Sequence, residues 1–312
     1  MKFKKVISTL SIATMLLAFS GCTKDLDLSI NIKNGDKYVI HEVTNQDMTM
    51  TLGTQQMATN QTVDMNLLMD VKDVDKDKNV TIEYKYDSMK MSATSNGQSM
   101  TYDSTKADES NPLNEVYKGI IGKSFTVKMT NKGKLLEIKG VTDLINSILD
   151  KVNVPDAQKE TLKSSLTRSF GDDAIKSMVQ QSMDIYPDKA VKKDDTWNKK
   201  YDIKTVFPIT VDNTFKLLSN DSSEVSLNQQ SNITADTKGT PIDIMGIKSN
   251  INLTGTSTGT VKINKSNGLL QSGEVTENMS GEMQMLKSSL IPQDIKVPMK
   301  MTAKITYDIK KK

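Results

Sequence analysis

The C-terminal part of the chain alternates strictly between apolar and polar residues. The apolar side of this alternation consists of Ile295, Val297, Met299, Met301, Ala303, Ile305, Tyr307 and Ile309. A period of two predicts a β-strand with one buried face and one solvated face. At about 3.3 Å per residue such a strand would be near 50 Å long, so we expect the sheet that contains it to curve.

Shorter runs of the same alternation occur at 63–71, 80–86, 201–203, 207–211 and 215–217. Turn-forming sequences separate the runs, among them Asn96-Gly97, Asn131-Lys132-Gly133 and Asn267-Gly268. The alternation changes phase near Ser88, which predicts a β-bulge there. Sheets with one solvated face are usually antiparallel, and we therefore predict a long, curved antiparallel sheet, either a half-barrel or barrel-like. The pattern does not decide whether the sheet closes.

The middle of the chain changes to a helical period. Apolar residues at helical spacing predict three helices between about 141 and 185: Leu144, Ile145, Ile148 and Leu149 in the first, Leu162, Leu166 and Phe170 in the second, and Ile175, Met178, Val179 and Met183 in the third. Each helix has one apolar face that must be buried, and the inner face of the curved sheet is the available partner. We therefore predict an α+β fold, with a central group of amphipathic helices packed on the inner face of the sheet.

The N-terminus has the anatomy of a secretory signal. Three lysines precede an apolar stretch that ends in small residues, and this stretch is too short and too often interrupted by Ser and Thr for a membrane span. Phe19-Ser20-Gly21-Cys22 resembles the bacterial lipobox, which implies cleavage between Gly21 and Cys22 and acylation of the Cys22 thiol. We expect a signal peptide at 1–21, a lipid-anchored tether at 22–27 and a single β-rich domain at 28–312. Several acyl chains would hold the protein on the extracytoplasmic face of a cell membrane.

The charge of the chain gives no reason to expect nucleic acid as a partner. The formal net charge is +3, and the three lysines of the signal peptide account for it, so that the mature chain has 3 − 3 = 0. Arg168 is the single arginine, and this preference for lysine favours an AT-rich genome and a Gram-positive-like envelope.

Few residues could perform catalysis. Cys22 is the single cysteine and would be consumed by acylation, and His41 is the single histidine, which leaves no multi-histidine metal site. The segment from Asp73 to Asn79 imitates the start of a calcium loop, but Lys78 replaces the glycine of the sharp turn and Tyr84 replaces the final glutamate. We predict no enzymatic activity, no catalytic or metal-binding residues and no cofactor.

Methionine is unusually frequent, with 19 residues in the chain. Its flexible, polarizable side chain suits surfaces that adapt to apolar ligands, but it also fills irregular cores. The candidate lining of an apolar cavity consists of Met65, Met69, Met89, Met91, Met283, Met285, Met299 and Met301. We expect a binder of a lipid or other hydrophobic ligand. The alternative is a structural or interaction lipoprotein whose core is filled and which has no small-molecule ligand.

Four short motifs carry a resemblance to a known family. The lipobox at Cys22, the Asp195-Thr196-Trp197 element before a long strand, and the Asn131-Lys132-Gly133 and Asn267-Gly268 hairpins resemble a family of uncharacterised bacterial envelope lipoproteins with a domain of unknown function. The resemblance implies a membrane anchor and brings no catalytic residues. In outline, long strands around a few helices are also similar to half-barrel carriers of lipids and lipoproteins, an analogy of fold alone.

Overall fold

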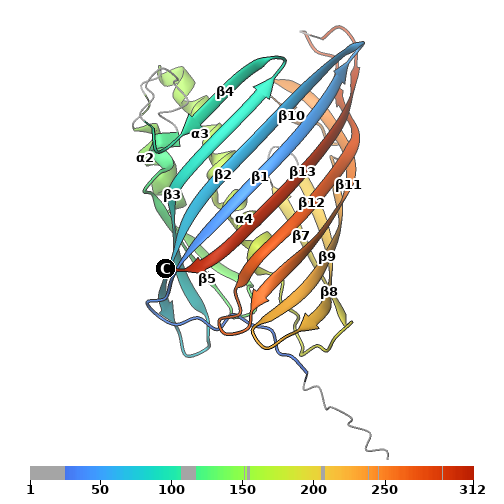
Figure 1. Ribbon diagram of the computed structural model, residues 1–312. Coiled ribbons are helices and arrows are strands. Elements are labelled where there is room, and N and C mark those ends of the chain that lie inside the picture. The colour runs from blue at the N-terminus through green and yellow to red at the C-terminus, as the bar shows by residue number, and fades with distance from the viewer. Residues whose placement is uncertain are drawn as a thin grey trace, which may run out of the picture.

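The computed structural model describes residues 25–106, 117–150, 152, 155–204, 208–237, 239–244, 246–289 and 291–312. They form one antiparallel sheet of thirteen strands, which Figure 1 shows as long, tilted ribbons. The strands are β1 (Lys37–Leu52), β2 (Gln55–Val74), β3 (Val80–Ser95), β4 (Gln98–Asp103), β5 (Ser124–Met129), β6 (Leu135–Lys139), β7 (Thr196–Lys204), β8 (Pro208–Asn220), β9 (Glu224–Asp236), β10 (Ile242–Ile244), β11 (Ile247–Asn264), β12 (Leu270–Met285) and β13 (Ile295–Lys311).

Two strips of neighbouring strands meet in the middle of the sheet. The order is β6-β5-β3-β2-β1-β13-β12-β11-β9-β8-β7, with β4 paired to β3 and β10 paired to β11. The first and last strands of the chain therefore pair with each other, from Tyr38 opposite Lys311 to Met50 opposite Met299. Among the described strands β6 and β7 are the two ends of this path and do not pair with each other, so the sheet is open.

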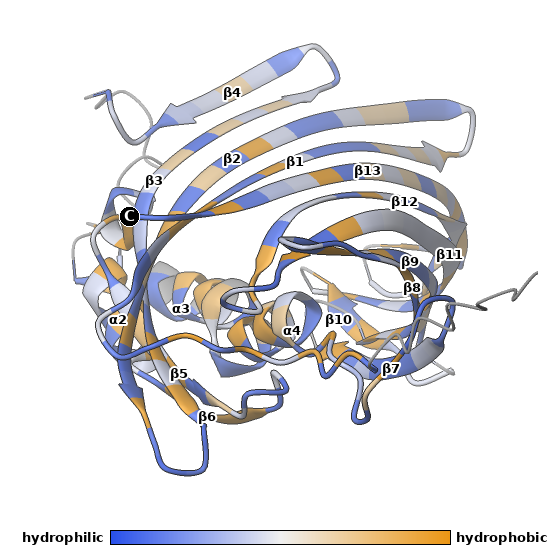
Figure 2. Ribbon diagram, turned by 60° about the horizontal axis from the view of Figure 1, so that its bottom comes forward, coloured by the Kyte–Doolittle hydropathy of each residue, from blue (hydrophilic) through white to orange (hydrophobic). Residues whose placement is uncertain are grey.

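Three helices connect the two outer strands. They are α2 (Val141–Leu149), α3 (Asp156–Phe170) and α4 (Asp172–Met183), which follow β6 and precede β7 along the chain. Helix α4 contacts both β6 and β7, and α2 contacts β5. Figure 2 shows the sheet curving around α3 and α4. The helices are thus placed by their connection to both edges of the sheet.

The prediction of an α+β fold with a central helix group was wrong. Strands account for 61% and helices for 13% of the residues that the structure describes, which makes this a mainly antiparallel β protein with a single open sheet and few helices. The helical period is clear in the sequence, but it covers only the connection between β6 and β7, whereas the period of two extends over most of the chain. The helices join the outer strands and do not form a layer of their own.

The main hydrophobic core lies at one end of the sheet, which we call the base. The base is the end at which β1 begins and β13 ends, and we call the opposite end, where β1 turns into β2, the rim. Core side chains from both strips and from the helices meet here, including Met69, Ile82, Phe125, Ile148 and Leu227, all of them fully buried. This core fixes the curvature of the sheet, because both strips contribute to it.

The segment that precedes β1 is docked along the base. Leu26 and Val191 exchange two backbone hydrogen bonds, of 2.7 and 2.9 Å. The Ile30 amide donates to the Asn131 carbonyl oxygen and the Asn31 amide to the Asn267 carbonyl oxygen, each at 2.8 Å. Leu28, Ile30 and Ile32 on this segment are each 4% exposed and belong to the main core. The N-terminal segment is therefore part of the folded domain from Leu26 onward.

Candidate functional site

A row of polar side chains crosses the concave face of the sheet about halfway between base and rim. Each member lies directly opposite the next on the neighbouring strand. In order from β7 to β2, this polar row consists of Lys199, Asn213, Ser231, Ser257, Glu277, Ala303, Gln46 and Gln61, of which Ala303 is the one apolar member. All share the face of the core residues, because the side-chain period of a strand is two. The row separates the main core from a second apolar region toward the rim.

The first half of the polar row is saturated with hydrogen bonds. The Asn213 amide donates to the Tyr201 hydroxyl at 2.6 Å, the Ser231 hydroxyl donates to the Asn213 side-chain oxygen, and the Gln229 amide donates to the same oxygen at 3.3 Å. Asn213 is fully buried, and burial raises the pKa of Tyr201 to about 12. Because its members satisfy one another, this half needs no other partner.

The second half of the row lacks partners. Ser257 is 2% exposed, and its hydroxyl oxygen has no hydrogen-bond partner among the described residues. Glu277 lies opposite Ser257 on β12, is only partly exposed, and makes no hydrogen bond or ion pair within the described part of the chain. Burial raises the pKa of Glu277, because water is removed from the carboxylate without a compensating contact. Buried polar groups without partners are uncommon and costly, so this half of the row is where a polar ligand atom would be stabilised.

The two glutamines of the row and a second acid are also weakly satisfied. The amide of Gln46 donates to the Met301 sulfur at 3.0 Å and the amide of Gln61 to the Met91 sulfur at 3.6 Å, and thioethers are weak acceptors. Glu42 lies on the same face nearer the base, where burial raises its pKa and its contact with the Thr44 hydroxyl is 3.5 Å long. The concave face therefore carries polar capacity that the chain itself uses poorly.

Methionines of β1, β2, β12 and β13 cover part of the concave face between the polar row and the rim, beside a buried cluster of other apolar side chains on β7, β8, β9 and β11. We call these methionines the methionine band; it consists of Met48, Met50, Met57, Met279, Met283, Met285, Met299 and Met301. Direct cross-strand pairs connect Met279 to Met301, Met301 to Met48, and Met299 to Met50. Met279 is buried, and the others are partly exposed. A flexible, polarizable and partly exposed apolar surface can therefore contact a ligand.

The polar row divides the eight methionines that the sequence indicated. Met283, Met285, Met299 and Met301 lie on the rim side and belong to the methionine band. Met69 is fully buried in the main core, and Met65 packs against it. Met89 and Met91 are buried in a small cluster with Tyr102. The eight side chains are therefore not gathered in one place.

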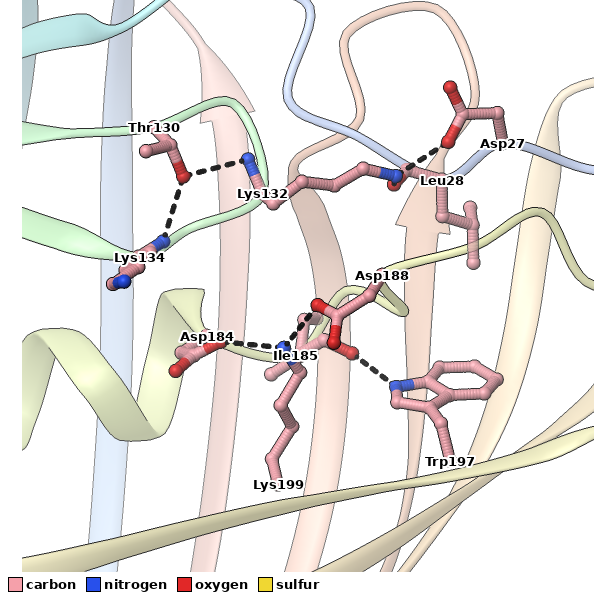
Figure 3. A network of polar contacts seen from close by, with 10 residues as sticks. All are labelled: Asp27, Leu28, Thr130, Lys132, Lys134, Asp184, Ile185, Asp188, Trp197 and Lys199. Carbon is pink, nitrogen blue, oxygen red and sulfur yellow. Dashed lines mark hydrogen bonds and ion pairs between the residues drawn. The ribbon is translucent and has the colours of Figure 1, made fainter.

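A charged cleft of about 650 Å³ opens at the base, between the β5–β6 hairpin, α4 and the start of β7. Figure 3 shows the contacts along it. The Lys199 ammonium nitrogen lies 3.0 Å from a carboxylate oxygen of Asp184 and 3.4 Å from a carboxylate oxygen of Asp188. These two ion pairs connect β7 to the end of α4 and to the segment that follows it. Lys132 pairs with Asp27 and donates to the Leu28 carbonyl oxygen at 2.7 Å. These contacts hold the hairpin, the helix and the N-terminal segment together, and the charged lining does not suit an apolar ligand.

The motifs singled out in the sequence also meet at the base. Gly133 (φ +77°) and Gly268 (φ +71°) lie in hairpin turns, and a Cβ atom there would overlap the carbonyl groups of Met183 and Ser29 respectively. The Trp197 indole donates to the Ile185 carbonyl oxygen at 2.7 Å. Only glycine allows these close backbone approaches, so the motifs hold the base together.

His41 lies on the convex face, away from the polar row. Its Nε2 is 2.9 Å from Asp64 Oδ1 and its Nδ1 is 3.3 Å from Asp308 Oδ1, beside a cavity of about 400 Å³. In the loop from Asp73 to Asn79, one Asp75 carboxylate oxygen accepts the Asn79 amide at 2.9 Å, and Lys128 approaches the other to 3.0 Å. No three His, Cys, Asp or Glu side chains in the described ranges are placed to hold a metal ion.

The predicted acylation site lies outside the described residues, as do Gly21 and the whole predicted signal peptide. Among the helices that the structure describes, none combines the length and the apolarity needed to cross a membrane. The prediction of a lipid anchor at Cys22 therefore stays a prediction.

The sequence contained a signal for the polar row that hydrophobic patterning alone does not use. In β11 the concave positions run Ile251, Leu253, Gly255, Ser257 and Gly259, and in β12 an acid stands between Val275 and Met279. Small or polar residues at positions of apolar parity mark a break in the buried face. Their assembly into one row depends on the register between strands, which no single strand specifies.

The profile of a family described as "Family of unknown function (DUF6263)" matches residues 77–270. No curated protein matches the chain. A structure of lipovitellin that concerns its lipid–protein interactions aligns over 89% of this chain at 9% identity and a TM-score of 0.46, and this chain spans 26% of it.

Two bacterial proteins give weaker structural alignments. OpdH of Pseudomonas aeruginosa aligns over 89% of this chain and 98% of its own, at 8% identity and a TM-score of 0.22. An outer membrane channel of Pseudomonas putida aligns over 90% of this chain and 98% of its own, at 7% identity and a TM-score of 0.25. At such scores the likeness carries no argument about function.

Proposed function

Since this chain belongs to the family of unknown function DUF6263, we propose its function from its own geometry: a lipoprotein, anchored to the membrane of a bacterial envelope, that binds a hydrophobic ligand on the methionine band. Binding without catalysis is the whole of the proposed activity. The proposed location is the extracytoplasmic face of a Gram-positive-like cell membrane, with Cys22 as the acylated residue.

The observation that carries this proposal is the partly exposed methionine band on a concave face. Seven of its eight members are partly exposed, although their strand positions have the parity of the core. Apolar surface left in contact with water has a cost of about 25 cal/mol per Å², which a bound apolar molecule would remove. Methionine also adapts its shape to different ligands, which favours a binding surface over a rigid core at this place.

The docked N-terminal segment supports the anchor and sets an orientation for it. Leu26 follows Cys22 by four residues, and a chain spans at most about 3.6 Å per residue, so an acylated Cys22 would lie within about 14 Å of Leu26. The base would then face the membrane, and the strands would rise away from it. A ligand would enter at the rim, on the side remote from the lipid surface.

Binding of the fluorescent apolar probe N-phenyl-1-naphthylamine tests the proposal. The wild-type protein should bind the probe, and Met299→Asp should weaken binding at least tenfold, because it places a charge in the methionine band. Lys300→Asp is the matched control, since Lys300 is the next residue of β13, exposed and on the convex face. Absence of probe binding by the wild type, or equal loss in both variants, would refute a ligand site on this band.

A structural or interaction role is the second candidate, and two features favour it. The base half of the concave face is already filled by the main core, and the edge strand β6 exposes Leu136 to 49%. Mass spectrometry of the protein purified natively from its host and then denatured separates the two functions. Release of a stoichiometric amphiphile supports binding, whereas a protein that releases none and binds no probe supports the structural role.

A further inference from the structure

Positive and negative charges on the concave face do not balance once the charges that form ion pairs are set aside. On the face shared with the core, strands β1–β3, β7–β9 and β11–β13 carry two lysines and two acids: Lys199, Lys311, Glu42 and Glu277. Lys199 pairs with Asp184 and Asp188, and Lys311 lies 2.7 Å from an Asp36 carboxylate oxygen. The two glutamates have no cationic partner among the described residues. The charge left unpaired on this face is therefore negative.

Glu277 stands where the polar row meets the methionine band. Its neighbour toward the rim on the same face is Met279, which begins the direct pairs Met279 to Met301 and Met301 to Met48. Opposite it lies Ser257, whose hydroxyl has no partner, between Gly255 and Gly259. A Cβ atom on Gly255 would overlap the backbone of β12 and the Met279 side chain, and one on Gly259 would overlap the backbone of β12 and the Val275 side chain, so these glycines let β12 pack closely on either side of Ser257. A carboxylate and a hydroxyl, neither of them hydrogen-bonded within the described part of the chain, thus adjoin an apolar surface.

We infer that Glu277 and Ser257 bind the ammonium head of a cationic amphiphile whose apolar tail lies along the methionine band. This inference rests on the proposed function and names the ligand class. An ammonium group donates hydrogen bonds that both the carboxylate and the hydroxyl can accept. A phosphate or carboxylate head would instead meet an unpaired negative charge in a site poor in water.

The length of the band fits such a tail. From Glu277 to Met285 there are eight residues of strand, or about 26 Å at about 3.3 Å per residue. The acyl chains of one bilayer leaflet occupy about half of a hydrocarbon core of ~30 Å. A single chain of membrane length therefore fits between the polar row and the rim.

Competition against bound N-phenyl-1-naphthylamine at pH 7.5 tests the inference with three compounds of equal tail: dodecylamine, dodecanol and dodecanoate. The wild-type protein should bind dodecylamine at least tenfold more tightly than dodecanol, and dodecanoate most weakly. Glu277→Gln should remove the preference for dodecylamine over dodecanol. Glu274→Gln is the matched control, because Glu274 lies on the convex face of the same strand and pairs with Lys304 at 3.0 Å.

Each result decides a different claim. Probe binding with no preference among the heads in the wild type, or a preference that survives in Glu277→Gln, overturns the inference and leaves the proposed function standing. No binding of the probe or of any compound by the wild type overturns the proposed function and this inference together. Thermal unfolding of each variant confirms that it is folded, and Ser257→Ala, which keeps the carboxylate, should weaken dodecylamine binding less than Glu277→Gln does.

Discussion

Replacing Gly268 by alanine tests how the N-terminal segment is held at the base. The backbone at Gly268 is left-handed (φ +71°), and an added Cβ would overlap the Ser29 carbonyl group. The Tyr186 hydroxyl also donates to the Gly268 carbonyl oxygen at 2.6 Å, so the turn cannot move without breaking a buried hydrogen bond. We expect the segment to detach from the turn.

The size of the effect follows from a matched control. Gly97 also has a left-handed backbone (φ +80°), but a Cβ there would meet nothing within 4 Å. Gly97→Ala should therefore cost only the conformational penalty, about 1–2 kcal/mol. Gly268→Ala should pay the same penalty and also loosen Ile30, which is 4% exposed and whose burial is worth about 1.5–3 kcal/mol. The difference between the two variants should be about 2 kcal/mol.

Urea unfolding followed by Trp197 fluorescence measures both values, because the indole is bonded to Ile185 in the base. Limited proteolysis should also cut Gly268→Ala, and not Gly97→Ala, within residues 25–36. Equal stabilities and equal proteolysis in the two variants would show that the turn does not fix the N-terminal segment.

Three further predictions follow from the fold and the proposed function. Glu277→Gln should stabilise the protein at pH 7.5 but much less at pH 4. Burial raises the pKa of Glu277 in the folded state, so the stability of the wild-type protein falls as the pH rises above the usual Glu value of about 4.5. Thermal unfolding of both proteins across this pH range checks the prediction. An equal change in stability at both pH values would contradict the conclusion that the Glu277 carboxylate is unpaired. Met69→Ala should cost about 2–5 kcal/mol in urea unfolding because Met69 is fully buried, whereas Met50→Ala should cost less than half of that because Met50 is partly exposed. Cys22→Ser should abolish palmitate labelling in cells and release the protein from membranes, and persistent labelling would disprove the anchor.

The strand content was largely readable from the sequence. The alternation predicted a strand from Ile295 to Ile309, and β13 extends from Ile295 to Lys311. The predicted bulge near Ser88 is confirmed, because Asn66 pairs with Ser88 and the next residue, Leu67, pairs with Tyr86. Local patterns of this kind are set by the face that each strand buries, and they need no knowledge of the partner strand.

The fold class and the polar row required information that the pattern lacks. The apolar faces of the helices showed that they must pack on the sheet, but not that α4 would contact both β6 and β7 at the open edge. The polar row from Lys199 to Gln61 combines residues of separate strands. Within its own strand, each polar residue of the row is an isolated interruption of the apolar face. Long-range pairing between the strands gathers these exceptions into one site.

The pairing of β1 with β13 has a consequence for how the protein folds. The two central strands of the sheet come from opposite ends of the chain, so the middle of the sheet forms only when the last residues are available. Contacts this remote in sequence slow folding, because the entropy of closing a long loop is lost before the pairing of the two strands contributes any stabilising free energy. Until then β1 has one unpaired edge, which is open to association with other chains. A truncation that removes β13 would therefore split the sheet at its centre instead of trimming its border, and we expect chains interrupted before Ile295 to aggregate.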